Sequence, residues 1–81
     1  MDSRVIAADF KEYMPECIIN EMLDSGDSII VSLTRKDIPK DSYMLDMTYL
    51  YNKKTRKIKP FVVLNDPKRY KEATKHVLFR R

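Results

Sequence analysis

Two alternating segments on either side of a basic turn favour a β-hairpin in the middle of this chain. Between residues 43 and 51, large apolar and aromatic side chains occupy every second position, which is the period of a strand with one buried face. A second stretch of strand-forming residues covers residues 56–65. Asn52 begins the turn between them and has a side chain suited to bonding the turn backbone, so we place a four-residue loop at 52–55.

The register of this hairpin follows from polarity. Folding about the loop pairs Tyr51 with Arg56 and Tyr49 with Ile58. The same register pairs Met47 with Pro60, Leu45 with Val62, and Tyr43 with Leu64. One face of the ribbon is then almost wholly apolar, while Lys57 and Lys59 lie on the other face. Because Pro60 has no backbone N–H, the return strand is expected at a sheet edge or at a bulge.

A helix is expected before the hairpin, over residues 9–24. Asp9 and Glu12 have the spacing of a capping box, and Pro15 kinks the helix or restarts it. The apolar residues that follow are spaced as on one helix face: Ile18, Ile19, Met22 and Leu23. Gly26 then has the character of a left-handed helix stop.

The remaining elements complete an α+β fold. Residues 28–34 alternate as a half-buried strand, and Asp66-Pro67 is a strong helix start, with apolar residues at helical spacing as far as Leu78. We therefore expect a three-stranded antiparallel sheet, with the N-terminal kinked helix and the C-terminal helix packed on one face.

Length and composition point to one small domain, residues 1–81. A core this small is only modestly stabilising, so a homodimer is compatible with the sequence. A lone cysteine forms no internal disulfide and fits a reducing compartment. The longest apolar runs are far too short to cross a bilayer. We expect a cytoplasmic protein that makes no contact with a membrane.

Charge is divided unevenly along the chain. Residues 1–34 carry seven acidic and two basic side chains, whereas residues 35–81 carry fourteen basic and five acidic ones. Such asymmetry is common in proteins with a charged partner, although it also arises on an ordinary solvated surface. The sequence alone leaves both interpretations open.

The basic residues of the hairpin and the C-terminal helix are the candidate nucleic-acid contacts, to DNA or RNA. They are Lys53, Lys54, Arg56, Lys57, Lys59, Lys68, Arg69 and Lys71. Cations clustered on a rigid turn attract phosphates, and the two segments form one surface if the helix begins beside the hairpin arm. Tyr49 and Tyr51 either stack on unpaired bases or belong to the core, and their alternation favours the core. Lysines also protect a sheet edge from unwanted pairing.

The acidic residues of the predicted N-terminal helix offer an alternative. A row formed by Glu12, Glu16, Glu21 and Asp24 could imitate phosphates and bind a partner protein. The chain would then be a protein-binding regulator or inhibitor, of the kind found among small mobile-element proteins. An ordinary solvated helix surface explains the same residues.

An enzyme is not expected. Cys17 and His76 are the one cysteine and the one histidine, and they fall on separate predicted helices, so a nucleophile–base pair is the weaker interpretation. With Gly26 as the sole glycine, no glycine-rich phosphate loop can form. A single histidine also rules out a metal site built from paired imidazoles, and the sequence indicates no cofactor.

The second half of the chain also resembles, in layout, the small three-strand-plus-helix DNA-binding domains that precede tyrosine recombinases. The resemblance covers the hairpin, its basic turn, the return strand and the segment 67–73. The glycine usual in that turn is absent here, and the acidic leading helix has no counterpart in those domains. The likeness is one of layout alone and assigns the chain to no family.

Overall fold

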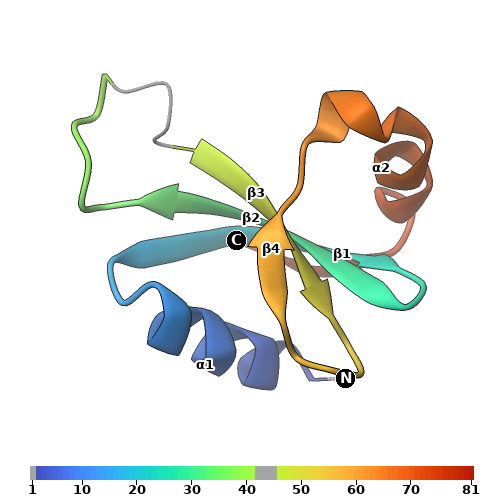
Figure 1. The fold of residues 1–81 in the computed structure, drawn as a ribbon, viewed down its shortest axis with the longest axis horizontal. Helices are drawn as coiled ribbons and strands as arrows, with labels where there is room; N and C mark the ends of the chain where they lie inside the picture. The colour runs from blue at the N-terminus through green and yellow to red at the C-terminus, as the bar shows by residue number, and fades with distance from the viewer. Residues whose placement is uncertain (1, 42–45) are drawn as a thin grey trace.

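The computed structural model describes residues 2–41 and 46–81, which form two helices, a short 3-10 turn and an antiparallel sheet (Figure 1). The elements in chain order are α1 (Ser3–Tyr13), β1 (Cys17–Ser25), β2 (Ser28–Arg35), β3 (Asp46–Asn52), β4 (Ile58–Pro60), η1 (Val63–Asn65), α2 (Pro67–Ala73) and β5 (Val77–Arg80). The strand order is β4-β3-β2-β1-β5. The α+β class and the antiparallel pairing are confirmed, but the expected three strands are wrong, since the described residues form five.

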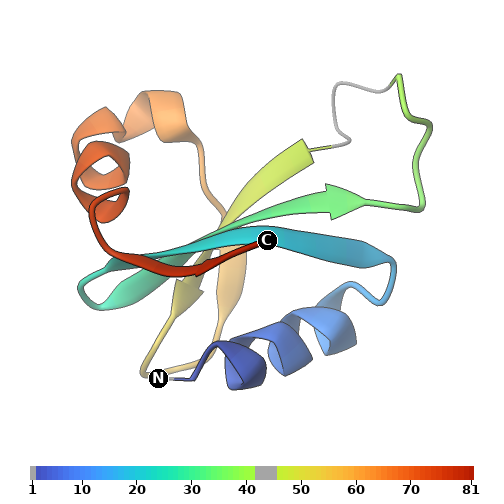
Figure 2. The same cartoon turned by 180° about the vertical axis from the view of Figure 1, so that it is seen from behind.

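The two helices cover opposite faces of the sheet, which corrects the expectation that both pack on one face (Figure 1 and Figure 2). The larger core lies beneath α1, where Ile6 and Phe10 meet inward-facing residues of β1, β2 and β3. A smaller core lies beneath α2, where Ala73 packs with Leu23 and Ile30. Each face of the central strands is therefore apolar where a helix covers it.

The expected helix over residues 9–24 is wrong. The first helix is α1, which begins after Asp2, whose side chain accepts a hydrogen bond from the Arg4 backbone N–H at 2.8 Å. Asp9 lies inside α1 rather than at its start. Residues Cys17–Ser25 form β1, which pairs with β2 across a tight turn in which Gly26 has a φ of 75°.

A β-bulge explains why β1 has a helix-like sequence. The pairing of β1 with β2 shifts between Ile19 and Glu21, so Asn20 is an extra residue in the ladder. The bulge reverses the alternation, and Met22 joins the same core as Ile19 although the two are three positions apart. Apolar residues three and four apart, which usually indicate a helix, here arise from a strand with one inserted residue.

The hairpin of β3 and β4 is confirmed with a different register. Tyr51 pairs with Ile58 and Tyr49 with Pro60, two residues further along than expected. The loop is longer because the backbone N–H of Asn52 bonds to the carbonyl of Lys57, and Arg56 adopts a φ of 60°. A shift of two residues leaves every side chain on its predicted face. The predicted pairs of Tyr43 and Leu45 lie outside the described residues.

Two details of the hairpin agree with expectation. The Asn52 side-chain oxygen accepts hydrogen bonds from the backbone N–H groups of Lys54 and Thr55, both at 2.9 Å. Pro60 lies on β4, which is an edge strand. The strand ends there, however, and the rest of the expected return strand continues as an extended segment and the η1 turn.

The start of α2 is as expected and its end is not. Asp66 accepts a hydrogen bond from the Arg69 backbone N–H at 3.2 Å, with Pro67 at the first helical position. The helix stops at Ala73, and Val77–Arg80 form β5, which pairs with β1. In residues Val77–Arg80, pairing with the free edge of β1 outweighs the local preference for a helix that the apolar spacing indicates.

Candidate nucleic-acid interface

Opposite charges from the two ends of the chain meet in the fold. The N-terminal third supplies the acids and the later segments supply the bases of four ion pairs. These are Asp9–Arg56 at 2.6 Å, Asp24–Lys53 at 3.0 Å, Glu21–Arg80 at 2.6 Å and Asp27–Arg69 at 3.5 Å. Much of the charge asymmetry along the sequence is therefore neutralised within the molecule and does not face a partner.

Arg56, one of the predicted phosphate contacts, binds a carboxylate of α1. Its guanidinium donates to both oxygens of Asp9, at 2.8 and 2.6 Å, and the hydroxyl of Tyr51 donates to the same carboxylate. The hydrogen bonds from Arg56 and then from Tyr51 lower the pKa of Asp9. Burial, followed by the bond to Asp9, raises the pKa of Tyr51. We refer to Asp9, Tyr51 and Arg56 as the Asp9 cluster.

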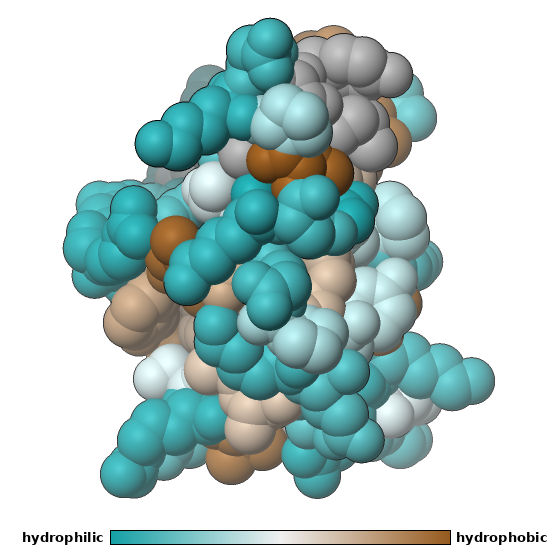
Figure 3. Space-filling view, turned by 90° about the vertical axis from the view of Figure 1, so that its left-hand side faces the viewer, coloured by the Kyte–Doolittle hydropathy of each residue, from teal (hydrophilic) through white to brown (hydrophobic). Residues whose placement is uncertain are grey.

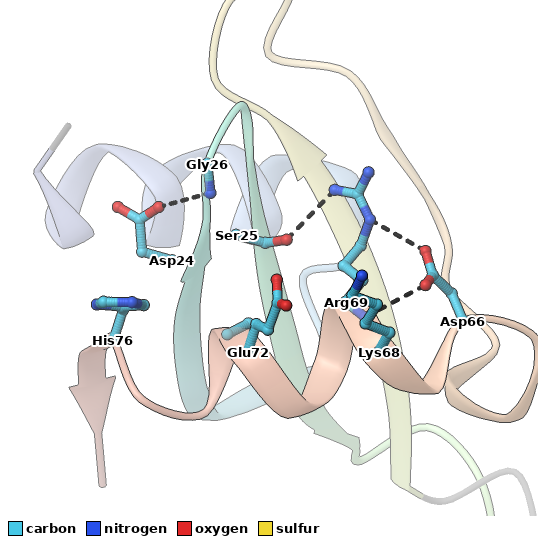
Figure 4. Close-up of a pocket in the computed structure, with 9 residues that line it drawn as sticks. Asp24, Ser25, Gly26, Asp66, Lys68, Arg69, Glu72 and His76 are labelled. Atoms are coloured by element: carbon cyan, nitrogen blue, oxygen red, sulfur yellow. Dashed lines mark hydrogen bonds and ion pairs between the residues drawn. The ribbon is translucent and has the colours of Figure 1, made fainter.

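Two further predicted contacts are held by acidic neighbours. The ammonium of Lys53 lies 3.0 Å from each carboxylate oxygen of Asp24, and this bond lowers the pKa of Asp24. The guanidinium of Arg69 bonds to the Asp66 carboxylate at 3.1 Å and to the Ser25 hydroxyl at 3.2 Å (Figure 4). These cations are oriented by the fold and partly neutralised by it.

The other five predicted contacts are exposed lysines: Lys54, Lys57, Lys59, Lys68 and Lys71. None of the ion pairs found among the described residues involves them. Lys68 and Lys71 lie three residues apart on α2, so they share one side of the helix. Their charges are available to a ligand in solution.

The hairpin and α2 meet at one hollow. It measures about 400 Å³, and Lys57, Lys59 and Arg69 line it together with the polar side chains of Asn52 and Thr55. One carboxylate, that of Asp27, also lines it and lies 3.5 Å from the Arg69 guanidinium. Lys59 and Arg69 also line an adjoining hollow of about 320 Å³ on the side of the η1 turn. We call the surface formed by Lys57, Lys59 and Arg69 the basic groove.

A larger hollow on the other side of Arg69 has mixed charge. It measures about 460 Å³ and lies between α2 and the β1–β2 turn (Figure 4). Its ionisable lining residues are Asp24, Asp66, Glu72, Lys68, Arg69 and His76. Three carboxylates face the cations there, whereas one, Asp27, lines the hollow at the basic groove, so the larger hollow is less suited to a polyanion.

The two tyrosines of β3 belong to the core. Tyr51 is fully buried and Tyr49 is 5% exposed, and the ring of Phe10 lies 6.1 Å from each of them between centroids. They are therefore not available for stacking on bases. Tyr13, at the end of α1, is 53% exposed and was not among the predicted contacts, because no sequence pattern marks it as exposed.

The predicted acidic surface does not form. Glu12 lies on α1 and Glu16 in the following turn, whereas Glu21 and Asp24 lie on β1 and not on a helix. Glu21 bonds to Arg80 at 2.7 Å, and Asp24 bonds to Lys53. The row of carboxylates depended on the helix over residues 9–24, so it is lost with that helix.

Cys17 and His76 do not form a catalytic pair. Cys17 begins β1, whereas the carbonyl of His76 accepts a bond from the backbone N–H of Asp24, seven residues further along the strand. Seven strand residues span roughly 23 Å. Cys17 is also fully buried, and burial raises the pKa of its thiol, so the reactive thiolate is suppressed at neutral pH.

We therefore expect a thiol-reactive dye to label Cys17 slowly in the folded protein. Labelling at pH 8 should be at least about tenfold slower without denaturant than in urea that unfolds the chain, because both access and thiolate formation require opening of the core. Absorbance of the released dye measures the rate. Rapid, complete labelling under native conditions would contradict the burial of Cys17.

At the end of the molecule opposite α2, the described residues are mostly hydrophilic (Figure 3). Figure 3 shows hydrophilic side chains over most of this end, with apolar residues in separate places. The longest helix described, α1, has 11 residues, and no described helix is long and apolar enough to cross a membrane. In comparisons with protein-family models, curated proteins and solved structures, no match to this chain was found.

Proposed function

We propose that this chain is a small non-enzymatic binding protein that contacts nucleic-acid phosphates through the basic groove. The observation that carries the proposal is that Lys57 and Lys59 of the hairpin arm line the same hollow as Arg69 of α2. Lysine and arginine side chains gathered from two segments make a larger cationic surface than either segment alone. Such surfaces bind phosphate backbones by releasing condensed counterions.

The fold also favours binding by fixing the groove in advance. The Asp9 cluster ties the hairpin loop to α1, and the bonds from Arg69 to Asp66 and Ser25 hold the start of α2 against the β1–β2 turn. A preformed surface loses less conformational entropy on binding than a flexible one. Lys54 in the hairpin loop, and Lys68 and Lys71 on α2, carry further exposed charge on the two segments that form the groove. Phosphate contacts of this kind give affinity without reading sequence.

The alternative of a protein-binding regulator has weaker support. It required the four acidic residues to share one surface, and two of them pair with cations of the same chain. Nucleic-acid binding is therefore the one function that we propose for this chain.

The proposal predicts that charge reversal in the basic groove abolishes most binding. The Lys57→Glu, Lys59→Glu double variant should bind a short DNA duplex or an RNA strand more than about tenfold more weakly at about 50 mM salt. The slope of log affinity against log salt on the duplex should also become shallower by about 2, since two phosphate contacts are lost. Fluorescence anisotropy of labelled oligonucleotides measures both quantities.

The matched control is Lys36→Glu with Lys40→Glu. These lysines are exposed on the loop after β2, away from α2 in Figure 1, and the control changes the net charge by the same amount. We expect its affinity to stay within about threefold of the original protein. Equal losses in both double variants would show that net charge and not the groove governs binding, and no binding of the original protein at low salt would end the proposal.

A further inference from the structure

The segment between β4 and α2 exposes two apolar side chains beside the basic groove. Leu64 is 89% exposed and Val62 is 54% exposed. Single exposed apolar residues are common on protein surfaces, but these two lie two positions apart at the η1 turn. Val62 also lines the hollow that contains Lys59 and Arg69. We call Val62 and Leu64 the apolar tip.

The backbone holds the apolar tip firmly in place. The N–H of Asn65 bonds to the carbonyl of Val62 at 3.0 Å, and the N–H of Asp66 bonds to the carbonyl of Val63 at 3.1 Å. Before the tip, the N–H of Phe61 bonds to the carbonyl of Thr48 at 3.0 Å, and the Phe61 ring packs into the core beneath α2. The tip therefore projects from a fixed support.

The charges around the tip suggest what covers it. Lys59 precedes it at the end of the hairpin arm, and Lys68 follows it at the start of α2, so exposed cations flank the apolar side chains. A complementary partner presents anionic groups on either side of an apolar interior. Duplex DNA has this arrangement, because the phosphates border the grooves and the stacked base pairs lie between them.

We propose that the apolar tip inserts as a wedge between base steps in the minor groove of duplex DNA. This inference rests on the proposed function and names its substrate as a duplex that can be kinked. Leucine is among the apolar side chains that separate stacked bases by insertion, whereas recognition of single strands depends on aromatic stacking. Tyr49 and Tyr51, the aromatic residues predicted beside the hairpin loop, are buried beneath α1. Insertion is easiest at flexible TA and CA steps.

The test uses the full chain and a duplex with 2-aminopurine beside a central TA step. We expect 2-aminopurine fluorescence to rise when the protein binds, because the base loses its stacking neighbour. Leu64→Ala should remove more than about half of this rise and weaken binding by about three- to tenfold, while the salt slope is unchanged because no phosphate contact is lost. Val5→Ala is the control, since Val5 is 38% exposed on α1 across the sheet.

The outcomes separate this inference from the proposed function. Salt-dependent binding of the original protein without a fluorescence rise overturns the wedge and leaves phosphate binding intact. Absence of binding to any nucleic acid overturns both. A third outcome is that Leu64→Ala leaves the fluorescence rise unchanged. If the same variant also fails to retain, after nuclease treatment, a partner protein that co-purifies with the original chain, the tip binds protein and the wedge is again overturned.

Discussion

Replacement of Phe10 by alanine is expected to lower the free energy of unfolding by about 3 to 5 kcal/mol. The Phe10 side chain is fully buried, and its ring lies 6.1 Å from the rings of both Tyr49 and Tyr51. Ile6 and Phe10 are the buried residues of α1, so removal of the larger one weakens the main attachment of the helix to the sheet. The cavity left beneath α1 adds to the loss of apolar burial.

This loss is large for a chain of 81 residues, whose total stability is expected to be about 4 to 12 kcal/mol. The variant should therefore unfold at a much lower urea concentration and be partly unfolded without denaturant. Val5→Ala on the same helix is the control, because Val5 is 38% exposed and should change stability by less than about 1 kcal/mol. Circular dichroism during urea titration measures both variants. A Phe10→Ala loss below about 1 kcal/mol would contradict the packing of α1.

The hairpin could be predicted from sequence because alternation constrains faces more strongly than register. The observed pairing differs from the expected one by two residues, yet Tyr49, Tyr51 and Ile58 still face the same core. The missing two residues lie in the loop, where Arg56 adopts a positive φ that no composition rule assigns to arginine. The geometry of the turn therefore limited the prediction of the register, while the alternation of side chains predicted the two faces correctly.

The errors in β1 and β5 have a different origin. The bulge at Asn20 gives β1 the apolar spacing of a helix, and only its partner strand reveals the inserted residue. Residues Val77–Arg80 continue the helical spacing of α2 but form a strand, because β1 offers an unpaired edge. Both outcomes depend on contacts between segments distant in sequence, which local patterns do not contain.

The sequence could predict which basic residues are exposed at the candidate site, but not which of them form ion pairs within the chain. The exposure of Lys57 and Lys59 follows from hairpin parity. The ion pair between Arg56 and Asp9, 47 residues away, follows from the packing of α1 beside the loop. The sequence pattern predicted the first helix over residues 9–24, with Asp9 at its start, and so gave no sign of this pair. The apolar tip was assigned to a strand face, where Leu64 would be buried, and it is exposed because β4 ends at Pro60.

The second large effect is expected from Asp9→Ala, which removes the shared acceptor of the Asp9 cluster. The hydroxyl of Tyr51, a fully buried residue, then loses its acceptor, and an unsatisfied buried hydroxyl costs about 1 to 3 kcal/mol. Arg56 also loses the partner that fixes its side chain at the hairpin loop. Glu12→Ala removes a carboxylate from the exposed side of the same helix and should change stability by less than about 0.5 kcal/mol.

A double-mutant cycle tests whether the loss acts through Tyr51. Tyr51→Phe should restore part of the stability lost in Asp9→Ala, because the buried hydroxyl that lacked an acceptor is then absent. In the original background the same change should destabilise the protein by about 1 kcal/mol. Urea titrations of the four proteins give the coupling energy. Additive effects would contradict a direct bond between Tyr51 and Asp9.

The pH dependence of the same variant follows from the sign of the pKa shift. Bonding to Arg56 and Tyr51 lowers the pKa of Asp9 in the folded state, so folding favours the ionised carboxylate. Its contribution is therefore present above the pKa of the unfolded chain, about 3.9, and is lost as the pH falls through the lower folded value. The stability difference between the original protein and Asp9→Ala should be constant from about pH 8 to 5 and shrink below about pH 4. A difference that grows on acidification would mean that the carboxylate is not held in its charged form by Arg56.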